Sequence, residues 1–395
     1  MAADHLELDL TIDPEREHLD VVATYSIPAG EVPQELGFYL HKNFTLTSVE
    51  GDGVESHSFG HGDSFLDKAG KRLQIIPKEA TRNAGLEFRV AYAGVIPEAF
   101  QGEWMEFVVD VLWFPMHESL ARKLTAEVHV SLPDGYTVFG CGETRQGDGA
   151  WRISMVDPSI DLNWIASREL EVRDFQRDGE TVTIATTHVD DGPANKVADQ
   201  IAWIMGWYNE TFGRPAPKHR LALVMRPLDR LSGYARPGYI ALHVGNDFET
   251  HTAEYFQFFA HEVAHLWWSQ GDSSNFENWL NESFAEYSSM LALRASGDYE
   301  AFERLMESKR GRMGGLPPVI GIERTSPHSE AVFYTKGCVL LQELEAKIGE
   351  EEFLDWLQGV VTARISRTDA LLLSLEDVQG ADVASWFEQK LMSAS

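Results

Sequence analysis

Two histidines, His261 and His265, stand four residues apart within an apolar and aromatic run that covers residues 255–268. On a helix this spacing places both imidazoles on one face, close enough to bind a single metal ion. Glu262 follows the first histidine and points beside that metal, where hydrolysis requires a general base. The pattern predicts a zinc-dependent hydrolase of the peptidase type, with the two histidines as metal ligands and Glu262 as the base.

A zinc site of this type needs a third protein ligand, and Glu282 is the candidate. Two neutral imidazoles and one carboxylate leave the ion a net positive charge and an open position for water, whose pKa falls toward about 7. Residues 266–281 supply the rest of the first helix and a polar turn, which is enough chain to bring a second helix back beside it. We therefore expect one zinc ion per chain.

Each of these residues also has a plainer interpretation. In a chain with 14 histidines, a motif of this form arises by accident in roughly a few per cent of cases. A single glutamate on a helix is usually a solvated surface residue. Glu286, four residues after Glu282, either orients a ligating histidine or is such a surface carboxylate. The same donors also bind cobalt or manganese.

The elements that must position these side chains are helices in the second half of the chain. Helical periodicity starts at Ala194 and continues beyond two short strands, at residues 221–225 and 239–244. The helices that follow are predicted at residues 252–268, 279–295, 299–309 and 330–348, with shorter pieces from residue 351.

The first half of the chain has the alternating pattern of strands. Apolar and polar residues alternate around residues 6–12, 86–91, 125–132 and 181–186, with turn-forming clusters between these segments. We therefore predict an α+β fold with two domains and a boundary near residue 190. Residues 1–190 would form an antiparallel β-domain, and residues 191–395 a mainly helical catalytic domain.

Composition excludes some classes of partner. The chain has 33 Lys and Arg against 62 Asp and Glu, a formal net charge of −29. Such a balance argues against binding to nucleic acid or to an anionic membrane, and it is typical of an acidic surface that keeps a protein in solution. No feature of the sequence predicts an oligomeric state.

The two cysteines, Cys141 and Cys338, cannot form a disulfide framework and have no metal-ligand spacing. We predict reduced, buried thiols in a cytoplasmic protein. The first five residues lack the charged start and apolar stretch of a signal peptide, and no run is long and apolar enough to span a bilayer.

Three motifs resemble those of the aminopeptidase N family of zinc peptidases. Residues 261–268, His-Glu-Val-Ala-His-Leu-Trp-Trp, look like its metal helix, and residues 279–285, Trp-Leu-Asn-Glu-Ser-Phe-Ala, look like its W-L-N-E-G-F-A element. Residues 334–337, Tyr-Thr-Lys-Gly, resemble its Y-x-K-G signature. The resemblance implies that Glu282 is the third zinc ligand and that Tyr334 helps to stabilise the tetrahedral intermediate.

The resemblance extends into the first half of the chain. Residues 113–118, Trp-Phe-Pro-Met-His-Glu, look like the family's F-P-C-x-D-E-P region, and residues 132–136 and 165–175 follow at the expected places. The family fold implies a saddle-like β-domain followed by a thermolysin-like catalytic domain. Many relatives continue into a large helical domain. Since only 61 residues follow Tyr334, we expect a short form that lacks it.

The departures from the family concern substrate recognition. The family usually has eighteen residues between the second histidine and the ligating glutamate, and the sixteen at 266–281 imply a shortened loop. In its G-x-M-E-N strand a glutamate binds the substrate's α-amine, and Ala235 or Arg236 stands at that position here. The family's glutamine, ten residues before its F-P pair, falls on Trp104. Glu106 is one acid that could replace these anchors.

We expect a zinc metallopeptidase or metallohydrolase that cleaves peptide or amide bonds, with aminopeptidase activity on short peptides. One alternative is an amidohydrolase or peptidase whose substrate has no free N-terminus, with Arg236 binding a substrate carboxylate rather than facing solvent. Another is a non-catalytic binding module on a peptidase fold. The expected partner is a small peptide or amide substrate.

Overall fold

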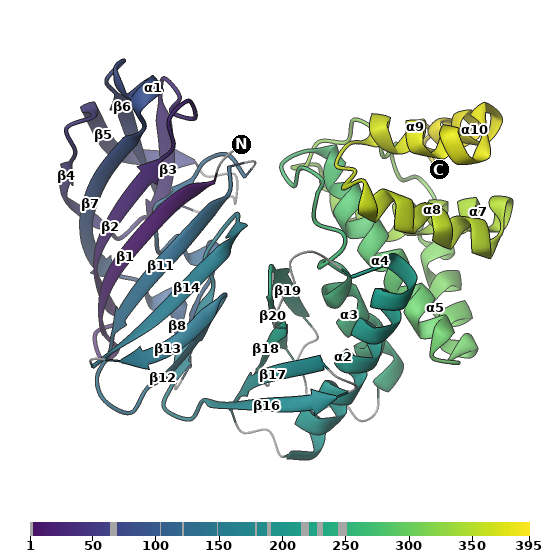
Figure 1. Cartoon of the computed structure of the whole chain (residues 1–395), viewed down its shortest axis with the longest axis horizontal. Helices are drawn as coiled ribbons and strands as arrows, with labels where there is room; N and C mark the ends of the chain where they lie inside the picture. Colours follow the sequence, from purple (N-terminus) through teal and green to yellow (C-terminus); the bar gives the residue numbers. More distant parts are fainter. Residues whose placement is uncertain are drawn as a thin grey trace. The chain divides into compact units, whose positions relative to one another are not determined.

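The computed structural model describes residues 3–63, 69–102, 104–120, 122–147, 149–177, 180–187, 191–214, 221–226, 232–243 and 251–395. The chain divides into two compact units, Met1–Val172 and Arg173–Ser395, which are described separately below (Figure 1). The division precedes the boundary that we predicted near residue 190. Strands just after the division led us to extend the first domain, because alternation does not reveal which sheet a strand joins.

Three sheets form the first unit. The largest has the order β13-β14-β11-β1-β2-β7-β4, and two four-stranded sheets have the orders β10-β3-β6-β5 and β12-β15-β9-β8. The strands of the large sheet are β1 (Asp4–Asp13), β2 (His18–Ile27), β4 (Thr45–Glu50), β7 (Leu86–Val95), β11 (Leu124–Ser131), β13 (Glu143–Gly147) and β14 (Ala150–Ser159). Those of the smaller sheets are β3 (Leu36–His41), β5 (Val54–Asp63), β6 (Ala69–Pro77), β8 (Phe100–Gln101), β9 (Trp104–Phe107), β10 (Met116–His117), β12 (Thr137–Gly140) and β15 (Trp164–Ser167). Short helical turns connect them at α1 (Thr81–Ala84), η1 (Pro97–Ala99) and η2 (Val109–Val111).

The large sheet is mixed, whereas we predicted an antiparallel domain. β1 and β11 pair in parallel, with Asp4 opposite Leu124, while the other pairs of this sheet are antiparallel. A residue period of two is the same in both directions, so alternation alone does not give the direction of a neighbouring strand. The predicted order, a β-rich domain followed by a helical one, is confirmed.

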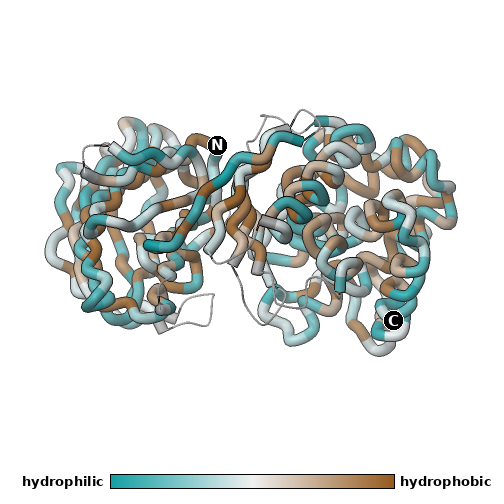
Figure 2. The backbone as a smooth tube through the Cα atoms, turned by 90° about the horizontal axis from the view of Figure 1, so that it is seen from below, coloured by the Kyte–Doolittle hydropathy of each residue, from teal (hydrophilic) through white to brown (hydrophobic). Residues whose placement is uncertain are grey.

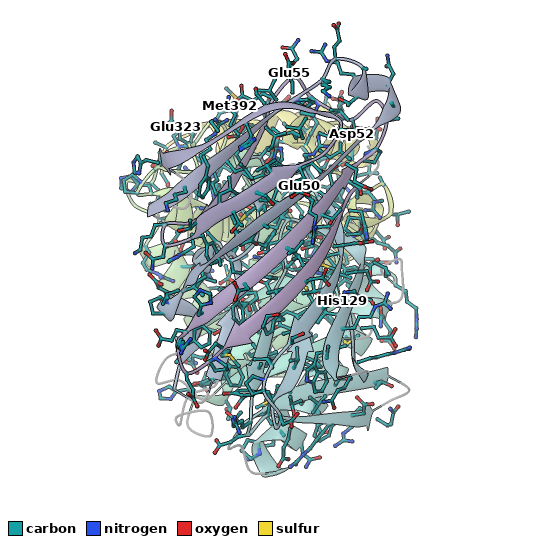
Figure 3. The ribbon with its side chains drawn as sticks, turned by 90° about the vertical axis from the view of Figure 1, so that its left-hand side faces the viewer. Glu50, Asp52, Glu55, His129, Glu323 and Met392 are labelled. Atoms are coloured by element: carbon teal, nitrogen blue, oxygen red, sulfur yellow. The ribbon has the colours of Figure 1, made fainter. Side chains whose placement is uncertain are left out.

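Alternation along β1 separates the two faces of the large sheet. Leu6, Leu8 and Leu10 are buried on one face. The other face carries exposed polar side chains such as Glu50 and His129 (Figure 3). This pattern is expected for a sheet that packs on a core with one face only.

The second unit begins with a five-stranded sheet of order β16-β17-β18-β20-β19. β17–β18 and β18–β20 are parallel pairs, and β19 is an antiparallel edge strand on β20. The strands are β16 (Glu171–Arg177), β17 (Glu180–Thr186), β18 (Leu221–Arg226), β19 (Ser232–Arg236) and β20 (Tyr239–His243). Both strands predicted in this half are confirmed, although residue 244 lies outside the described residues.

Helices make up most of the second unit. They are α2 (Asp191–Phe212), α3 (Thr252–Ala264), α4 (Trp279–Ala295), α5 (Tyr299–Gly311), α6 (Ser329–Ala331), α7 (Gly337–Ile348), α8 (Glu350–Thr362), α9 (Thr368–Gln379) and α10 (Ala381–Met392), with a 3₁₀ turn η3 (Phe276–Asn278) and a π-helical turn η4 (Val332–Lys336). Hydrophobic and hydrophilic residues alternate along the backbone of each unit (Figure 2). In the second unit the buried residues form one hydrophobic cluster that includes the sheet and the helices.

Two predicted helices differ in detail. The helix predicted at 252–268 ends at Ala264, because the N–H groups of Leu266 and Trp267 bond to carbonyls three residues earlier and so tighten the chain. The helix predicted at 330–348 is interrupted by η4. Hydrophobic periodicity does not distinguish these tighter or wider turns from a continuous α-helix.

Both cysteines are free and buried, as predicted. Within the described parts of the chain, no helix has the length and hydropathy needed to cross a membrane.

One buried hydroxyl links three elements of the second unit. A carboxylate oxygen of Glu277, in η3, accepts hydrogen bonds from the backbone N–H and the hydroxyl of Thr368, at 2.8 and 2.6 Å. The same hydroxyl accepts a hydrogen bond of 2.7 Å from the indole of Trp279. Glu277 therefore satisfies the first N–H group of α9, and the hydroxyl of Thr368 joins α9 to the start of α4.

We expect Thr368→Val to lower the free energy of unfolding by about 1–3 kcal/mol, because it leaves the buried indole N–H without an acceptor. Denaturant unfolding followed by tryptophan fluorescence measures this change. Thr362→Val, at an exposed position at the end of α8, is the control and should shift stability by less than about 0.5 kcal/mol. Equal effects of the two substitutions would contradict this account of Thr368.

Candidate active site

α3 presents both histidines on one face because its remaining face packs into the core. Tyr255, Phe259 and Val263 are buried in the hydrophobic cluster of the second unit. His265 directly follows the last helical residue, and its backbone angles of −62° and −13° keep it in the helical conformation. It therefore continues the face that carries His261, as the four-residue spacing predicts.

The connection between α3 and α4 is held by side-chain to backbone bonds. Asn281 accepts a hydrogen bond of 2.8 Å from the N–H of Gly271 and donates one of 3.0 Å to its carbonyl. A Cβ at Gly271 would lie 2.4 Å from the carbonyl oxygen of Glu277, so the chain passes too closely for a side chain. These contacts place Glu282 in the first turn of α4, next to α3.

His261, His265 and Glu282 converge as the spacing predicts. Their potential ligand atoms all lie within 4.8 Å of one another. Oε2 of Glu282 is 3.5 Å from Nε2 of each histidine, and the two imidazole rings are nearly perpendicular, at 87°. Two imidazole nitrogens and one carboxylate oxygen are the donor set of catalytic zinc sites.

A buried oxygen supports this fit. Oε2 of Glu282 is shielded from solvent and accepts no hydrogen bond from the residues that the structure describes. Burial would raise the pKa of Glu282, but attraction to His265 and His261 holds it well below its ordinary value. A half-buried, ionised carboxylate with one oxygen shielded beside two imidazoles is suited to bind a cation.

Glu262 lies beside these three residues and is 5% exposed. Burial raises its pKa above the ordinary value, and the charges of His261 and His265 offset this only in part. A raised pKa makes the carboxylate a stronger base toward the proton of a water molecule, which general-base catalysis requires.

The structure decides between the two interpretations of Glu286. Its side chain is 7% exposed and is therefore not a surface carboxylate. Oε2 of Glu286 lies 2.7 Å from Nδ1 of His261, and Oε1 forms an ion pair with the ammonium group of Lys309. Burial raises the pKa of Glu286, but Lys309 and His261 bring it down to about 2, so this carboxylate stays ionised.

The same surroundings act on His261. Burial lowers the pKa of this imidazole, but the neighbouring carboxylates of Glu282 and Glu286 outweigh burial and raise the pKa to about 10. One ring nitrogen thus faces the ligand cluster and the other faces Glu286. This arrangement fixes the orientation of the ring.

Tyr334 lies in η4, with its ring 5.5 Å from that of His261 and inclined to it by 25°. The residue is 37% exposed, yet desolvation and the negative charge of Glu282 raise the pKa of its phenol well above the ordinary value. The hydroxyl therefore keeps its proton and can donate a hydrogen bond. π-helical turns of this kind occur frequently at functional sites.

Two side chains hold the backbone of η4. Ser283 donates a hydrogen bond of 2.7 Å to the carbonyl of Phe333, and Lys309 donates one of 3.0 Å to the carbonyl of Tyr334. Gly337 is required next to this turn, because a Cβ there would lie 1.9 Å from Oγ of Ser283. The glycine of the Tyr-Thr-Lys-Gly motif thus permits close packing on α4.

Arg236 ends the edge strand β19, and its backbone pairs with Tyr239 of β20. Its guanidinium group lies 5.4 Å from the centre of the Tyr234 ring, and its Nη1 donates a hydrogen bond of 2.8 Å to the carbonyl of Ala235. The positive charge of Arg236 also lowers the pKa of Glu262, although less than burial raises it. The charge of this arginine therefore reaches the candidate base.

Trp104 and Glu106 are placed on β9 of the first unit, and both are buried. Their sheet neighbours on β15 are Ser167 and Ile165, respectively. Their role in substrate binding stays a prediction.

Sequence reasoning missed two lysines around the site. Lys309 is the ion-pair partner of Glu286. Lys336, in the Tyr-Thr-Lys-Gly motif, is also buried and donates hydrogen bonds to the carbonyls of Pro317 and Ser393, at 2.8 and 2.6 Å. A lysine on an amphipathic helix normally indicates a solvated position, so the local pattern gives no signal for Lys309.

Known proteins resemble this chain in sequence and in fold. No family model matches the chain. Aminopeptidase N from Streptomyces lividans is 22% identical over 315 residues, which are 71% of this chain and 36% of that protein. The chain thus spans about a third of the length of this curated relative.

Solved structures match over nearly the whole chain. An M1 zinc metallopeptidase from Deinococcus radiodurans has a TM-score of 0.70 and 18% identity, covering 99% of this chain and 93% of that one. A two-domain M1 zinc metallopeptidase bound to L-tryptophan has a TM-score of 0.71 and 18% identity, with coverages of 99% and 94%. Leukotriene A4 hydrolase from Saccharomyces cerevisiae has a TM-score of 0.76 and 16% identity, with coverages of 99% and 68%. The chain is therefore similar in sequence to aminopeptidase N, and it has the fold of the M1 zinc metallopeptidases.

Proposed function

We propose that this protein is a zinc-dependent hydrolase that cleaves peptide or amide bonds. The observation that carries the proposal is the convergence of His261, His265 and Glu282 within 4.8 Å, with the buried carboxyl group of Glu262 beside them. The relatives named above are called aminopeptidase N and M1 zinc metallopeptidase, which supports the same class of reaction.

His261, His265 and Glu282 would hold one zinc ion per chain. Bound there, zinc supplies a Lewis acid that polarises the scissile carbonyl and lowers the pKa of water. Glu262 accepts the proton of the attacking water and passes it to the leaving nitrogen as the C–N bond breaks. Tyr334 donates a hydrogen bond to the oxygen on which negative charge develops.

Metal analysis tests the ligand assignment. We expect the purified protein to retain about one zinc ion per chain after dialysis, and His265→Ala to lose it, because two protein ligands hold the ion much less tightly than three. His129→Ala, an exposed histidine of the first unit, is the control and should keep the metal. Full zinc content in His265→Ala would contradict the assignment.

The roles of Glu262 and Tyr334 predict variants that separate metal binding from turnover. Glu262→Gln keeps the size of the side chain but cannot accept a proton, so it should retain zinc and lose turnover. Tyr334→Phe removes one donor to the oxyanion and should lower kcat by about 10²–10³. Zinc content and hydrolysis of a peptide library measure both effects. A Glu262→Gln variant that still hydrolyses its substrate well would rule out the general-base assignment.

Within this class, the first candidate function is aminopeptidase activity on short peptides, which the names of the relatives favour. It requires acidic groups that bind the substrate's α-amine. Residues at the position of the family's amine-binding glutamate are not acidic here, since Ala235 or Arg236 stands there. Glu106 is the candidate replacement, with Trp104 in place of the family's glutamine.

The second candidate is a peptidase or amidohydrolase whose substrate has no free N-terminus and carries a carboxylate. It is supported by the place of Arg236 at the end of β19, from where its positive charge lowers the pKa of the candidate base Glu262. A guanidinium group binds carboxylates in a two-pronged geometry and repels an ammonium group.

Hydrolysis of free and N-acetylated versions of the same peptides separates these two functions. Strong loss on acetylation supports the aminopeptidase and excludes the second candidate. If the second candidate is correct, Arg236→Glu should lower kcat/KM for carboxylate-bearing substrates by about 10- to 100-fold, because a charged hydrogen bond is lost. Arg312→Glu, an exposed arginine at the end of α5, is the matched control and should have little effect.

A non-catalytic binding module was the remaining alternative. Both residues that such a module would be expected to lose, Glu262 and Tyr334, are present and lie beside the ligand cluster. Zinc-loaded protein without turnover on a broad peptide and amide library would favour the binding module over the proposed hydrolase.

A further inference from the structure

A closed ring of contacts joins four residues from four elements, and the candidate zinc ligand His261 is one of the four. Lys309, on α5, is 6% exposed, and its ammonium group bonds to a carboxylate oxygen of Glu286 and, at 3.0 Å, to the carbonyl of Tyr334. The other oxygen of Glu286, on α4, lies 2.7 Å from Nδ1 of His261 on α3. The ring closes where the imidazole of His261 faces the phenol ring of Tyr334, in η4, at 5.5 Å.

Two members of this ring, His261 and Tyr334, have different roles in the candidate site. His261 is a candidate metal ligand, whereas Tyr334 is the candidate donor to the oxyanion. Lys309 acts on His261 through its ion pair with Glu286. It acts on Tyr334 through the hydrogen bond to the backbone carbonyl of that residue.

We propose that Lys309 is a positioning residue that couples the orientation of the zinc ligand His261 to the placement of Tyr334. The proposal rests on the hydrolase function above. Lys309 forms a buried ion pair with Glu286 and so holds this carboxylate in place. The other carboxylate oxygen lies 2.7 Å from Nδ1 of His261, and the second ring nitrogen of His261 faces the ligand cluster, where it can bind metal.

Lys309 also acts on the turn that carries Tyr334. A π-helical turn is wider than an α-helical one, and its backbone needs support from side chains. Ser283 binds one carbonyl of this turn, at Phe333, and Lys309 binds the next one, at Tyr334. Loss of Lys309 therefore releases the tyrosine at the same time as it disturbs the histidine.

The competing explanation is that Lys309 and Glu286 form a buried ion pair that only stabilises the fold. The charge-free double variant Glu286→Gln/Lys309→Met distinguishes the two explanations. Removing both charges together avoids leaving one charge buried alone, so the double variant should fold even where Lys309→Met does not. A purely structural pair predicts wild-type zinc affinity and turnover in this variant.

The experiment compares zinc affinity, measured by competition with a chelator, and kcat on the best peptide substrate. We expect Lys309→Met and the double variant each to bind zinc about 10- to 100-fold more weakly than the wild type, and to lose kcat by a similar factor at saturating zinc. Arg310→Met is the matched control, because Arg310 is the next residue of α5 and its partners, Gln342 and Glu307, lie away from the ligand cluster. It should change neither quantity by more than about twofold.

The coupling to Tyr334 has its own readout. In the Tyr334→Phe background the double variant should lose less kcat than in the wild-type background, because the part of its effect that acts through the phenol is already absent. Wild-type zinc affinity in the folded double variant, or equal loss of kcat in both backgrounds, would overturn the proposal. A wild-type protein that binds zinc but hydrolyses no substrate would contradict the proposed function, while the chelator competition would still decide whether Lys309 orients His261.

Discussion

The second unit depends on withdrawing three carboxylates from most of the surrounding water: Glu262 and Glu286 are buried, and Glu282 is half-buried. Glu262, Glu282 and Glu286 lie where α3 packs against α4. Burying a carboxylate without a partner costs several kcal/mol, so each must be compensated or protonated. Glu282 is compensated by the two imidazoles, and Glu286 by Lys309 and His261. Glu262 has the least compensation, and its pKa is raised.

This difference in compensation gives the three chemically identical groups different properties. An ionised carboxylate with an oxygen that accepts no hydrogen bond is suited to a metal, as Oε2 of Glu282 is. An ionised carboxylate held by an ammonium group fixes the histidine beside it, as Glu286 does. A carboxylate with a raised pKa is a stronger base, which is the property required of Glu262. The chemistry of the site thus follows from which neighbours each glutamate has.

Catalytic groups and recognition groups come from different kinds of element. The candidate ligands and the base lie on packed helices, and the phenol of Tyr334 lies on a turn that two side chains hold. Ala235 or Arg236 stands at the position of the family's amine-binding glutamate, and both lie at the end of the edge strand β19. Neither side chain is a carboxylate, so the charge offered to a substrate changes while the helices are unaltered. Hydrolytic chemistry can therefore be retained while recognition changes.

Several features of the fold could be predicted from the sequence. The helix predicted at 279–295 has the bounds of α4, because its apolar periodicity is strong and a polar turn precedes it. The strand at 221–225 is confirmed within β18. The structure divides the chain after Val172 and not near residue 190, and it pairs β1 with β11 in parallel within a domain that we predicted to be antiparallel. A strand pattern identifies faces and not partners. The end of α3 at Ala264 was also not predicted, because the helix ends where the backbone hydrogen bonds change to a tighter turn.

By itself, the sequence determined which residues form the reactive set, because His261, Glu262 and His265 are brought together by the period of one helix. Glu282 required a resemblance as well as a spacing, and Tyr334 required the resemblance alone. Only the tertiary structure decided that Glu286 is buried against His261 and that Lys309 reaches both Glu286 and the carbonyl of Tyr334. Those contacts join helices that are distant in sequence. The solvation and charge partners of a side chain depend on such packing, and no local pattern encodes it.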